Sequence, residues 1–220
     1  MLTKTSNVRT TIISSDDLTH TYEVKKELRN EKGELAQGKD AVLVGMYPTI
    51  TAEEPYKTDL STMHLLNNME ALGLRSVRIV NLFSRVCSAK LSARGLEVDQ
   101  KNMGYIEGIM KEESFPTSLM ILAWGNSMAT CQAANLSKAR ISNLFGTYYP
   151  KGKLYQLTAP GLNVENQEPV HVLYLGIRHK NEDWSIEEYQ FPEKSIPVVT
   201  GEPKVKGAVK RKARKDEVTR

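Results

Sequence analysis

The feature that most constrains this sequence is a series of short apolar runs separated by segments whose apolar residues recur at helical spacing. The runs lie at residues 41–46, 76–83, 119–124 and 153–158. Runs of this length are typical of strands that are buried on both faces of a sheet. Because such strands alternate with helical segments along the chain, the pattern predicts parallel strands joined by helical crossovers.

Three segments between the runs are predicted to be helices. Asp59 is expected to cap a helix that ends at Gly73, and Asp99 is expected to cap a second helix that continues to Met110. The third covers about residues 128–145. The predicted fold is therefore α/β, a three-layer sandwich with a mostly parallel sheet and helices on both faces.

The two ends of the chain complete this prediction. An alternating run at Tyr22–Leu28 indicates a hairpin over residues 20–46, which would place antiparallel N-terminal strands at one edge of the sheet. A further apolar run, Val170–Ile177, is interpreted as another strand. With 220 residues, one domain is favoured over two. The predicted organisation is an N-terminal arm at 1–19, a single α/β domain at 20–192 and an irregular basic tail at 193–220.

Composition excludes several classes of protein. The longest apolar run, Leu119–Trp124, is far shorter than the roughly 18 residues of a membrane span. Residues 1–6 lack the apolar centre of a signal peptide. Cys87 and Cys131 are too few for a disulfide framework or a thiolate zinc site. We therefore expect a cytoplasmic protein that does not contact membranes. The sequence also lacks phosphate-loop, nucleophile-elbow and zinc motifs, so we expect no metal and no cofactor.

Positive charge is concentrated at the C-terminus. Residues 204–220 carry a net charge of +6, whereas residues 1–203 carry −2. The tail is either a solvated, disordered end or an arm that neutralises the phosphates of nucleic acid. Its basic residues are Lys204, Lys206, Lys210, Arg211, Lys212, Arg214, Lys215 and Arg220.

Candidate site residues follow from the predicted sheet, because ligands of open parallel sheets bind outside the carboxyl ends of the strands. The residues at these ends are Gly45, Tyr47, Pro48 and Thr49, then Asn81 and Phe83, then Trp124, Gly125 and Asn126, and finally His171. Asn81 either ties down a neighbouring loop or reads a ligand with its donor and acceptor. Trp124 and Gly125 are either core and turn residues or a close approach to a ligand, and His171 is either structural or catalytic.

The same blocks, in this order, resemble a bacterial and phage family, domain of unknown function 1643. The matching segments are Tyr47-Pro48-Thr49, Asn81-Leu82-Phe83, Trp124-Gly125-Asn126 and His171-Val172-Leu173-Tyr174-Leu175. The resemblance covers roughly residues 20–180. No single block is distinctive, but four in sequence are fairly specific.

The order of blocks is also similar, more distantly, to the uracil-DNA glycosylase superfamily. That resemblance implies a Gly-x-x-Pro loop at Gly45–Pro48, a base-reading amide at Asn81 and a late histidine at His171. In such chemistry the amide reads the base edge and the histidine stabilises the leaving oxygen. It implies a nucleobase or nucleic acid as the ligand and hydrolysis of an N-glycosidic bond.

Two departures from this second pattern bear on catalysis. Tyr47 stands where such enzymes commonly carry Asp or Asn, and a phenol is a poor base at neutral pH. Val172 replaces the proline that follows the histidine. The acids that could supply a carboxylate instead are Glu53, Glu54 and Asp59. Three hypotheses stay open: a nucleobase-directed hydrolase, a non-catalytic nucleic-acid-binding module of the same fold, and an enzyme acting on a nucleotide-related small molecule.

Overall fold

The computed structural model describes residue 3 and residues 5–88, 91–163 and 167–190. Seven strands in this part of the chain form one sheet in the order β1-β2-β4-β3-β5-β6-β7. In chain order the elements are β1 (Asn7–Ser14), β2 (Thr21–Arg29), β3 (Lys39–Gly45), α1 (Leu60–Asn68), β4 (Leu74–Asn81), α2 (Gln100–Met110), a 3-10 turn (Phe115–Thr117), β5 (Leu119–Leu122), α3 (Gln132–Tyr148), β6 (Leu154–Thr158), α4 (Val172–Arg178) and β7 (Ser185–Glu188).

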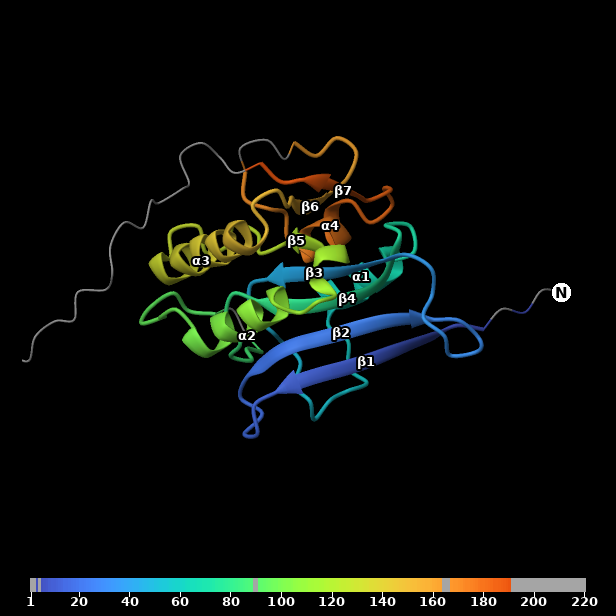
Figure 1. The fold of residues 1–220 in the computed structure, drawn as a ribbon, viewed down its shortest axis with the longest axis horizontal. Helices are drawn as coiled ribbons and strands as arrows, with labels where there is room; N and C mark the ends of the chain where they lie inside the picture. Colours follow the sequence, from blue (N-terminus) through green and yellow to red (C-terminus); the bar gives the residue numbers. More distant parts are fainter. Residues whose placement is uncertain (1–2, 4, 89–90, 164–166, 191–220) are drawn as a thin grey trace, which may run out of the picture.

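The centre of the sheet is parallel, as the sequence predicts. β3 pairs in parallel with β4 on one side and with β5 on the other, and β5 pairs in parallel with β6. The outer pairs, β1–β2, β2–β4 and β6–β7, are antiparallel. Figure 1 shows the long β1–β2 hairpin at one edge of the sheet and the short β7 near the other.

Helices cover both faces of the sheet, which confirms the three-layer prediction. α2 and α3 pack on one face, where Met103, Ile106 and Ile141 join a large apolar cluster. α1 and α4 pack on the other face around Leu65 and Leu175. The side chains of Asp59 and Asp99 cap α1 and α2 as predicted, by accepting backbone N–H bonds three residues further on.

The prediction of a strand at Val170–Ile177 is wrong, because this run forms helix α4 from Val172 onward. Val172 and Leu175 are buried whereas Tyr174 and Ile177 are exposed. This is the spacing of a helix with one buried face, and a short apolar run does not distinguish that arrangement from a strand.

The predicted pairing within residues 20–46 also differs from the structure. An antiparallel hairpin does lie at the edge, but it joins β1 to β2, and β3 lies at the centre of the sheet. β1 belongs to the segment 1–19 that the sequence analysis treats as an arm. The basic tail lies outside the described residues. None of the described helices has the length and the apolar character to cross a membrane.

Candidate functional site

The topological switch point of the sheet, the position called the crevice in open α/β folds, lies between the carboxyl ends of β3 and β5. The connection that leaves β3 runs through α1 on one face, whereas the connection that leaves β5 runs through α3 on the other. Such a reversal is the position at which open α/β sheets bind ligands. Gly45 is the last residue of β3, and Gly125 is the third residue after β5, so neither of these two positions carries a side chain.

Asn81 lies directly beside Gly45. The two residues are paired in the β3–β4 register, and a β-carbon built on Gly45 would lie 2.6 Å from Asn81 Oδ1. Asn81 is 7% exposed, and its side-chain amide has no hydrogen-bond partner among the described residues. The amide atoms are not among the fully buried unpartnered atoms of the described residues, so they reach solvent and a ligand can approach them. Asn81 therefore presents unused hydrogen-bonding capacity at the crevice.

The N-terminus of α2 fixes the backbone that carries Asn81. Asn102, which is fully buried, donates from Nδ2 to the Asn81 carbonyl at 2.7 Å. Asp99 accepts from both the backbone N–H and the hydroxyl of Ser84, at 3.0 and 2.5 Å. These bonds fix the end of β4, so the position of the Asn81 amide is set by packing against an entire helix.

His171 lies beside Gly125 and caps α4. A β-carbon on Gly125, whose φ is +67°, would lie 2.9 Å from the His171 Cβ, and the Gly125 N–H donates to the Pro169 carbonyl at 2.9 Å. His171 Nδ1 accepts from the Leu173 N–H at 3.1 Å. Nδ1 is therefore unprotonated, and the neutral imidazole carries its proton on Nε2. Burial lowers the pKa of His171, and the negative charge of Asp59 partly opposes that shift. The ring is neutral at pH 7 and has one N–H to donate.

Asp59 brings a carboxylate to the same edge. Its Oδ1 accepts from the Thr62 N–H at 2.7 Å and its Oδ2 accepts from the Thr49 hydroxyl at 2.8 Å. α1 and α4 both begin at this edge and pack against each other. Of the three acids that the sequence analysis considered, Asp59 is the one whose charge acts on His171. Glu53 and Glu54 are exposed, and Glu54 pairs with Lys57.

Several predicted ligand-binding residues lie elsewhere. Tyr47 is half-buried and packs against the cluster on the α2–α3 face, and Phe83 is 2% exposed within that cluster. Pro48 is buried and its carbonyl accepts from the Cys87 N–H at 3.0 Å. Asn126 is exposed. The predicted residues that gather at the crevice are Gly45, Asn81, Gly125, His171 and, through Asp59, Thr49.

Trp124 has a structural environment. It is 1% exposed, and its Nε1 donates to Glu168 Oε2 at 2.7 Å. Lys138 pairs with the other oxygen of Glu168 at 2.8 Å and lies over the indole ring, 5.8 Å from the ring centroid. The indole thus packs on the face opposite α1 and α4, between the sheet and α3. This supports the interpretation of Trp124 as a core residue.

The sequence analysis did not identify Asn102. The residue sits on the inner face of α2 next to Met103, three positions after the cap. A polar residue on the apolar stripe of a helix is the signal that could have found it, since a buried amide needs a partner.

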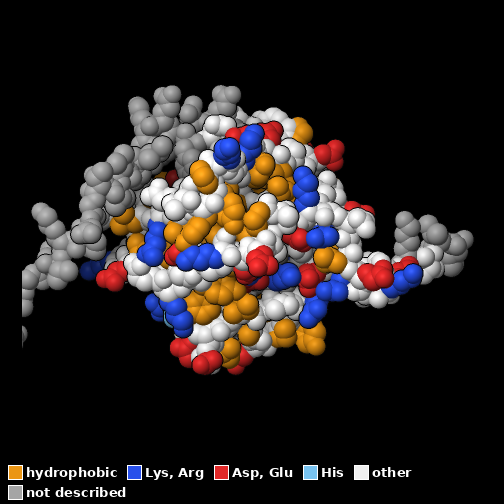
Figure 2. Space-filling view, viewed as in Figure 1, with side chains coloured by type: hydrophobic (Ala, Val, Ile, Leu, Met, Phe, Trp, Pro, Cys, Tyr) orange, Lys and Arg blue, Asp and Glu red, His pale blue; other side chains and the backbone are white. Residues whose placement is uncertain are grey.

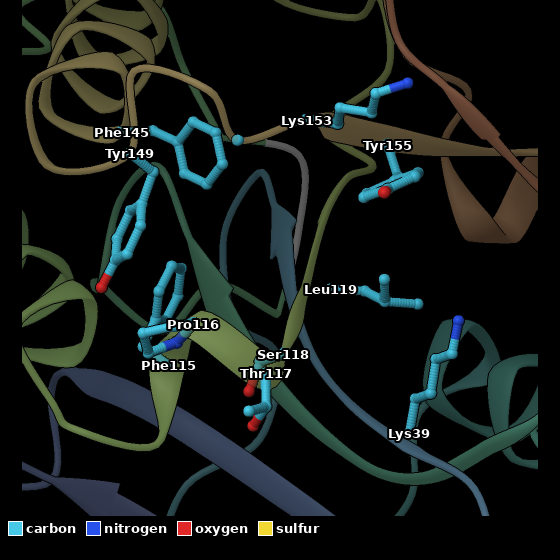
Figure 3. Close-up of a pocket in the computed structure, with 11 residues that line it drawn as sticks. Lys39, Phe115, Pro116, Thr117, Ser118, Leu119, Phe145, Tyr149, Lys153 and Tyr155 are labelled. Atoms are coloured by element: carbon cyan, nitrogen blue, oxygen red, sulfur yellow. The ribbon is translucent and has the colours of Figure 1, made fainter.

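Two clefts lie at the opposite edge of the sheet, where the parallel strands begin. One has a volume of about 250 Å³ and is bounded by the rings of Phe115, Phe145, Tyr149 and Tyr155, with Lys39 and Lys153 at its rim (Figure 3). The other has a volume of about 240 Å³ and shares Phe115 and Ser118 with the first. The aromatic wall is already packed together, with Phe115 and Tyr149 centroids 5.0 Å apart.

Basic and acidic side chains are interleaved on the face shown in Figure 2, with no broad patch of either sign. In the described part of the chain, no three His, Cys, Asp or Glu residues are grouped so that they could hold a metal ion.

Comparison with known proteins gives one match. The model of a family described as Protein of unknown function (DUF1643) matches residues 22–171. This span runs from β2 to the residue that caps α4, and it contains Gly45, Asp59, Asn81 and His171. No curated protein and no solved structure matches the chain.

Proposed function

The chain belongs to the DUF1643 family, whose description assigns no activity, and from the chemistry of the crevice we propose that it binds a nucleobase and hydrolyses the N-glycosidic bond that holds it. The ligand is a nucleobase carried by a nucleic acid. The proposal rests on residues 45, 59, 81, 125 and 171, and it agrees with the more distant resemblance to uracil-DNA glycosylases.

The observation that carries the proposal is the position of Asn81, a mostly buried residue whose side-chain amide makes no hydrogen bond to the described residues and still reaches solvent. An amide offers a donor and an acceptor in one plane, which matches the edge of a nucleobase. Gly45 and Gly125 leave room for the Asn81 amide and the His171 side chain to lie directly against the ends of two neighbouring strands. In the free protein the Asn81 amide is open to solvent, and a base would offer it a matching acceptor and donor.

His171 supplies the complementary function of stabilising the leaving group. Breaking the bond between sugar and base places negative charge on the base, and a neutral imidazole can donate its Nε2–H to an oxygen that gains this charge. The cap on α4 holds the ring in the tautomer that this requires. Because burial lowers the pKa of His171, the ring stays neutral at physiological pH.

Asp59 is assigned to the attacking water. A carboxylate has about four acceptor positions, and Asp59 uses two of them for Thr62 and Thr49. A remaining lone pair accepts a proton from water as the water oxygen bonds to the sugar carbon and the bond to the base breaks. The departing base takes the electron pair of that bond, next to His171.

The test measures base release and base binding separately. Single-stranded and duplex oligonucleotides that contain each common base or uracil are incubated with the protein, and free base is quantified by chromatography. Binding of the free bases is measured by calorimetry. We expect Asn81→Ala to reduce both signals at least tenfold with a smaller effect on folding, whereas Asn126→Ala, which removes an exposed amide at the neighbouring strand end, leaves both unchanged.

One observation favours a second function, a binding module without catalysis. Both oxygens of Asp59 already have protein partners, and Tyr47 packs into the core on the other face. That function predicts binding that depends on Asn81 without release of base from any oligonucleotide. Turnover of a free nucleoside without any binding of oligonucleotides would instead identify the third hypothesis, an enzyme for a nucleotide-related small molecule.

A further inference from the structure

The two edges of the sheet differ in how they are protected from pairing with another strand. β7 has four residues, Ser185–Glu188, and two of them are glutamates. β1 has eight residues, without proline, lysine or an acid, and Arg9 is its single charged side chain. Natural edge strands are usually protected by shortness, charge or proline, because their outward N–H and C=O groups can pair with another strand. β7 has such protection, and β1 has little.

The outer edge of β1 is open in the described structure. The described ladder of β1 runs to β2 alone, with residues 7–14 opposite residues 21–29. Val8 is 49% exposed and Ile13 is 38% exposed, although both are large apolar residues in a regular strand. A strand of this length, with apolar side chains in solvent, is a template for a second strand.

We propose that β1 pairs antiparallel with β1 of a second copy of this chain, in a register centred on Thr10, so that the two sheets become one continuous sheet. This dimer is independent of the function proposed for the crevice, which lies at the carboxyl ends of the central strands.

Symmetry limits the possible registers. A two-fold axis perpendicular to the sheet keeps every side chain on its own face. Because side chains alternate between the two faces along a strand, an even-numbered residue must pair with an even-numbered residue of the partner, and an odd-numbered residue with an odd-numbered one. Centring the pair on Thr10 places Val8 opposite the partner's Ile12, and Arg9 opposite the partner's Thr11. Centring it on Thr11 instead places Val8 opposite the partner's Ser14. The register centred on Thr10 therefore contains two Val8–Ile12 pairs, which are related by the two-fold axis. We favour this register because both pairs are apolar.

The same register extends an existing apolar face. Ile12 pairs with Val24 of β2, and Val24 pairs with Ile79 of β4. Side chains that are directly opposite in an antiparallel pair lie on the same face. The partner's Val8 would therefore continue this row beyond Ile12, and the exposed Val8 of the first copy would be covered in return. Arg9 lies 3.8 Å from Glu27 of its own chain, which offsets its charge near the partner.

The test uses analytical ultracentrifugation of the whole chain over a concentration series. We expect the mass to rise from 24.7 kDa toward twice that value. Thr11→Glu places an acid opposite the partner's Arg9 and Thr11→Lys places a base there, so the first variant tightens the dimer and the second weakens it. Each opposite pair occurs twice, which corresponds to roughly a two- to thirty-fold change in dissociation constant.

Matched controls lie on the other edge. Ser185→Glu and Ser185→Lys make the same charge changes at an exposed position of β7 and should leave the mass unchanged. Thr11 also lies opposite Lys25 in its own chain, so the free energy of unfolding of each variant is measured to show that it is folded. A mass of 24.7 kDa at every concentration up to about 1 mM overturns the proposal. Weakening by both Thr11 variants overturns the register, since a pair centred on Thr11 would bring like charges together.

Discussion

The side-chain oxygen of Asn81 lies 2.6 Å from the point that a β-carbon of Gly45 would occupy. The amide of one strand therefore takes the space that a side chain of the neighbouring strand would fill. This relationship explains why β3 ends in glycine in a run of otherwise apolar residues, and it makes Gly45 a sensitive probe of the crevice.

Gly45→Ala is expected to displace the Asn81 amide and to weaken nucleobase binding at least tenfold. The new methyl group has no free space, so we expect a loss of about 1–3 kcal/mol in the free energy of unfolding. Denaturant titration gives the stability, and calorimetry with free bases gives the binding. Gly104→Ala is the control, because Gly104 is exposed in α2 with no atom within 4 Å of a new β-carbon. It should stabilise the protein by about 0.5–1 kcal/mol. Unchanged binding by Gly45→Ala would separate this pair of residues from ligand recognition.

Stability should fall at acidic pH because of His171. Burial places its native pKa below the unfolded value of about 6.5. Below pH 6.5 the unfolded chain therefore binds more protons than the native protein, so acid favours unfolding; the loss is complete below the native pKa. His171→Asn keeps an acceptor for the cap on α4 but does not titrate. In denaturant titrations from pH 8 to pH 5, the wild-type protein should lose unfolding free energy relative to His171→Asn as the pH falls. A constant difference would show that His171 has the same pKa in both states.

Trp124→Phe is expected to affect folding and to leave binding at the crevice unchanged. The substitution removes the hydrogen bond to the Glu168 carboxylate, which should cost about 1–3 kcal/mol of unfolding free energy. Trp184→Phe removes a bond to the neutral carbonyl of His179 and should cost less. Thermal and chemical unfolding provide the comparison. A loss of base binding in Trp124→Phe at unchanged stability would return Trp124 to the ligand site.

The basic tail is expected to add salt-dependent, sequence-independent affinity for nucleic acid. Four to six phosphate contacts would give a log–log salt slope of roughly 3–5. A shortened chain that ends at Pro203 should lose most of this slope and keep its melting temperature, because the removed segment contains too few apolar residues to contribute to the core. Fluorescence titrations of labelled DNA at several salt concentrations measure the slope. Equal slopes for the two chains would contradict a role for the tail in binding.

The sequence predicted the central architecture because the central strands are buried on both faces and therefore appear in the sequence as continuous apolar runs. It also predicted the caps at Asp59 and Asp99, whose signal is local. It failed at residues 170–177, where burial on one face of a helix gives a run as apolar as that of a strand. The pairing of β2 with β1 and β4 was missed because strand order depends on contacts that the local pattern does not contain.

Local patterns in the sequence indicated part of the candidate site. Asn81 and His171 were identified as candidates because each is a polar residue beside an apolar run, and this signal does not depend on the tertiary structure. The direction of a side chain at a strand end cannot be obtained in this way, so Tyr47, Phe83 and Trp124 were kept as candidate ligand-binding residues, and the structure places them in the cluster on the α2–α3 face. The role proposed for Asp59 depends on the packing of α1 against α4, which brings together segments more than 100 residues apart.

The backbone hydrogen bond from Cys87 to the Pro48 carbonyl makes Cys87 a suitable position for a fluorescent label near the crevice. Cys87 is half-buried and follows β4, whereas Cys131, the other cysteine, is 6% exposed. A thiol-reactive fluorophore should therefore label Cys87 selectively under native conditions, since accessibility limits the reaction at Cys131. The backbone N–H of Cys87 donates to the Pro48 carbonyl, so the label would lie beside the loop that follows Gly45. Changes in its emission would report occupancy of the crevice in the unmodified sequence, without an introduced cysteine.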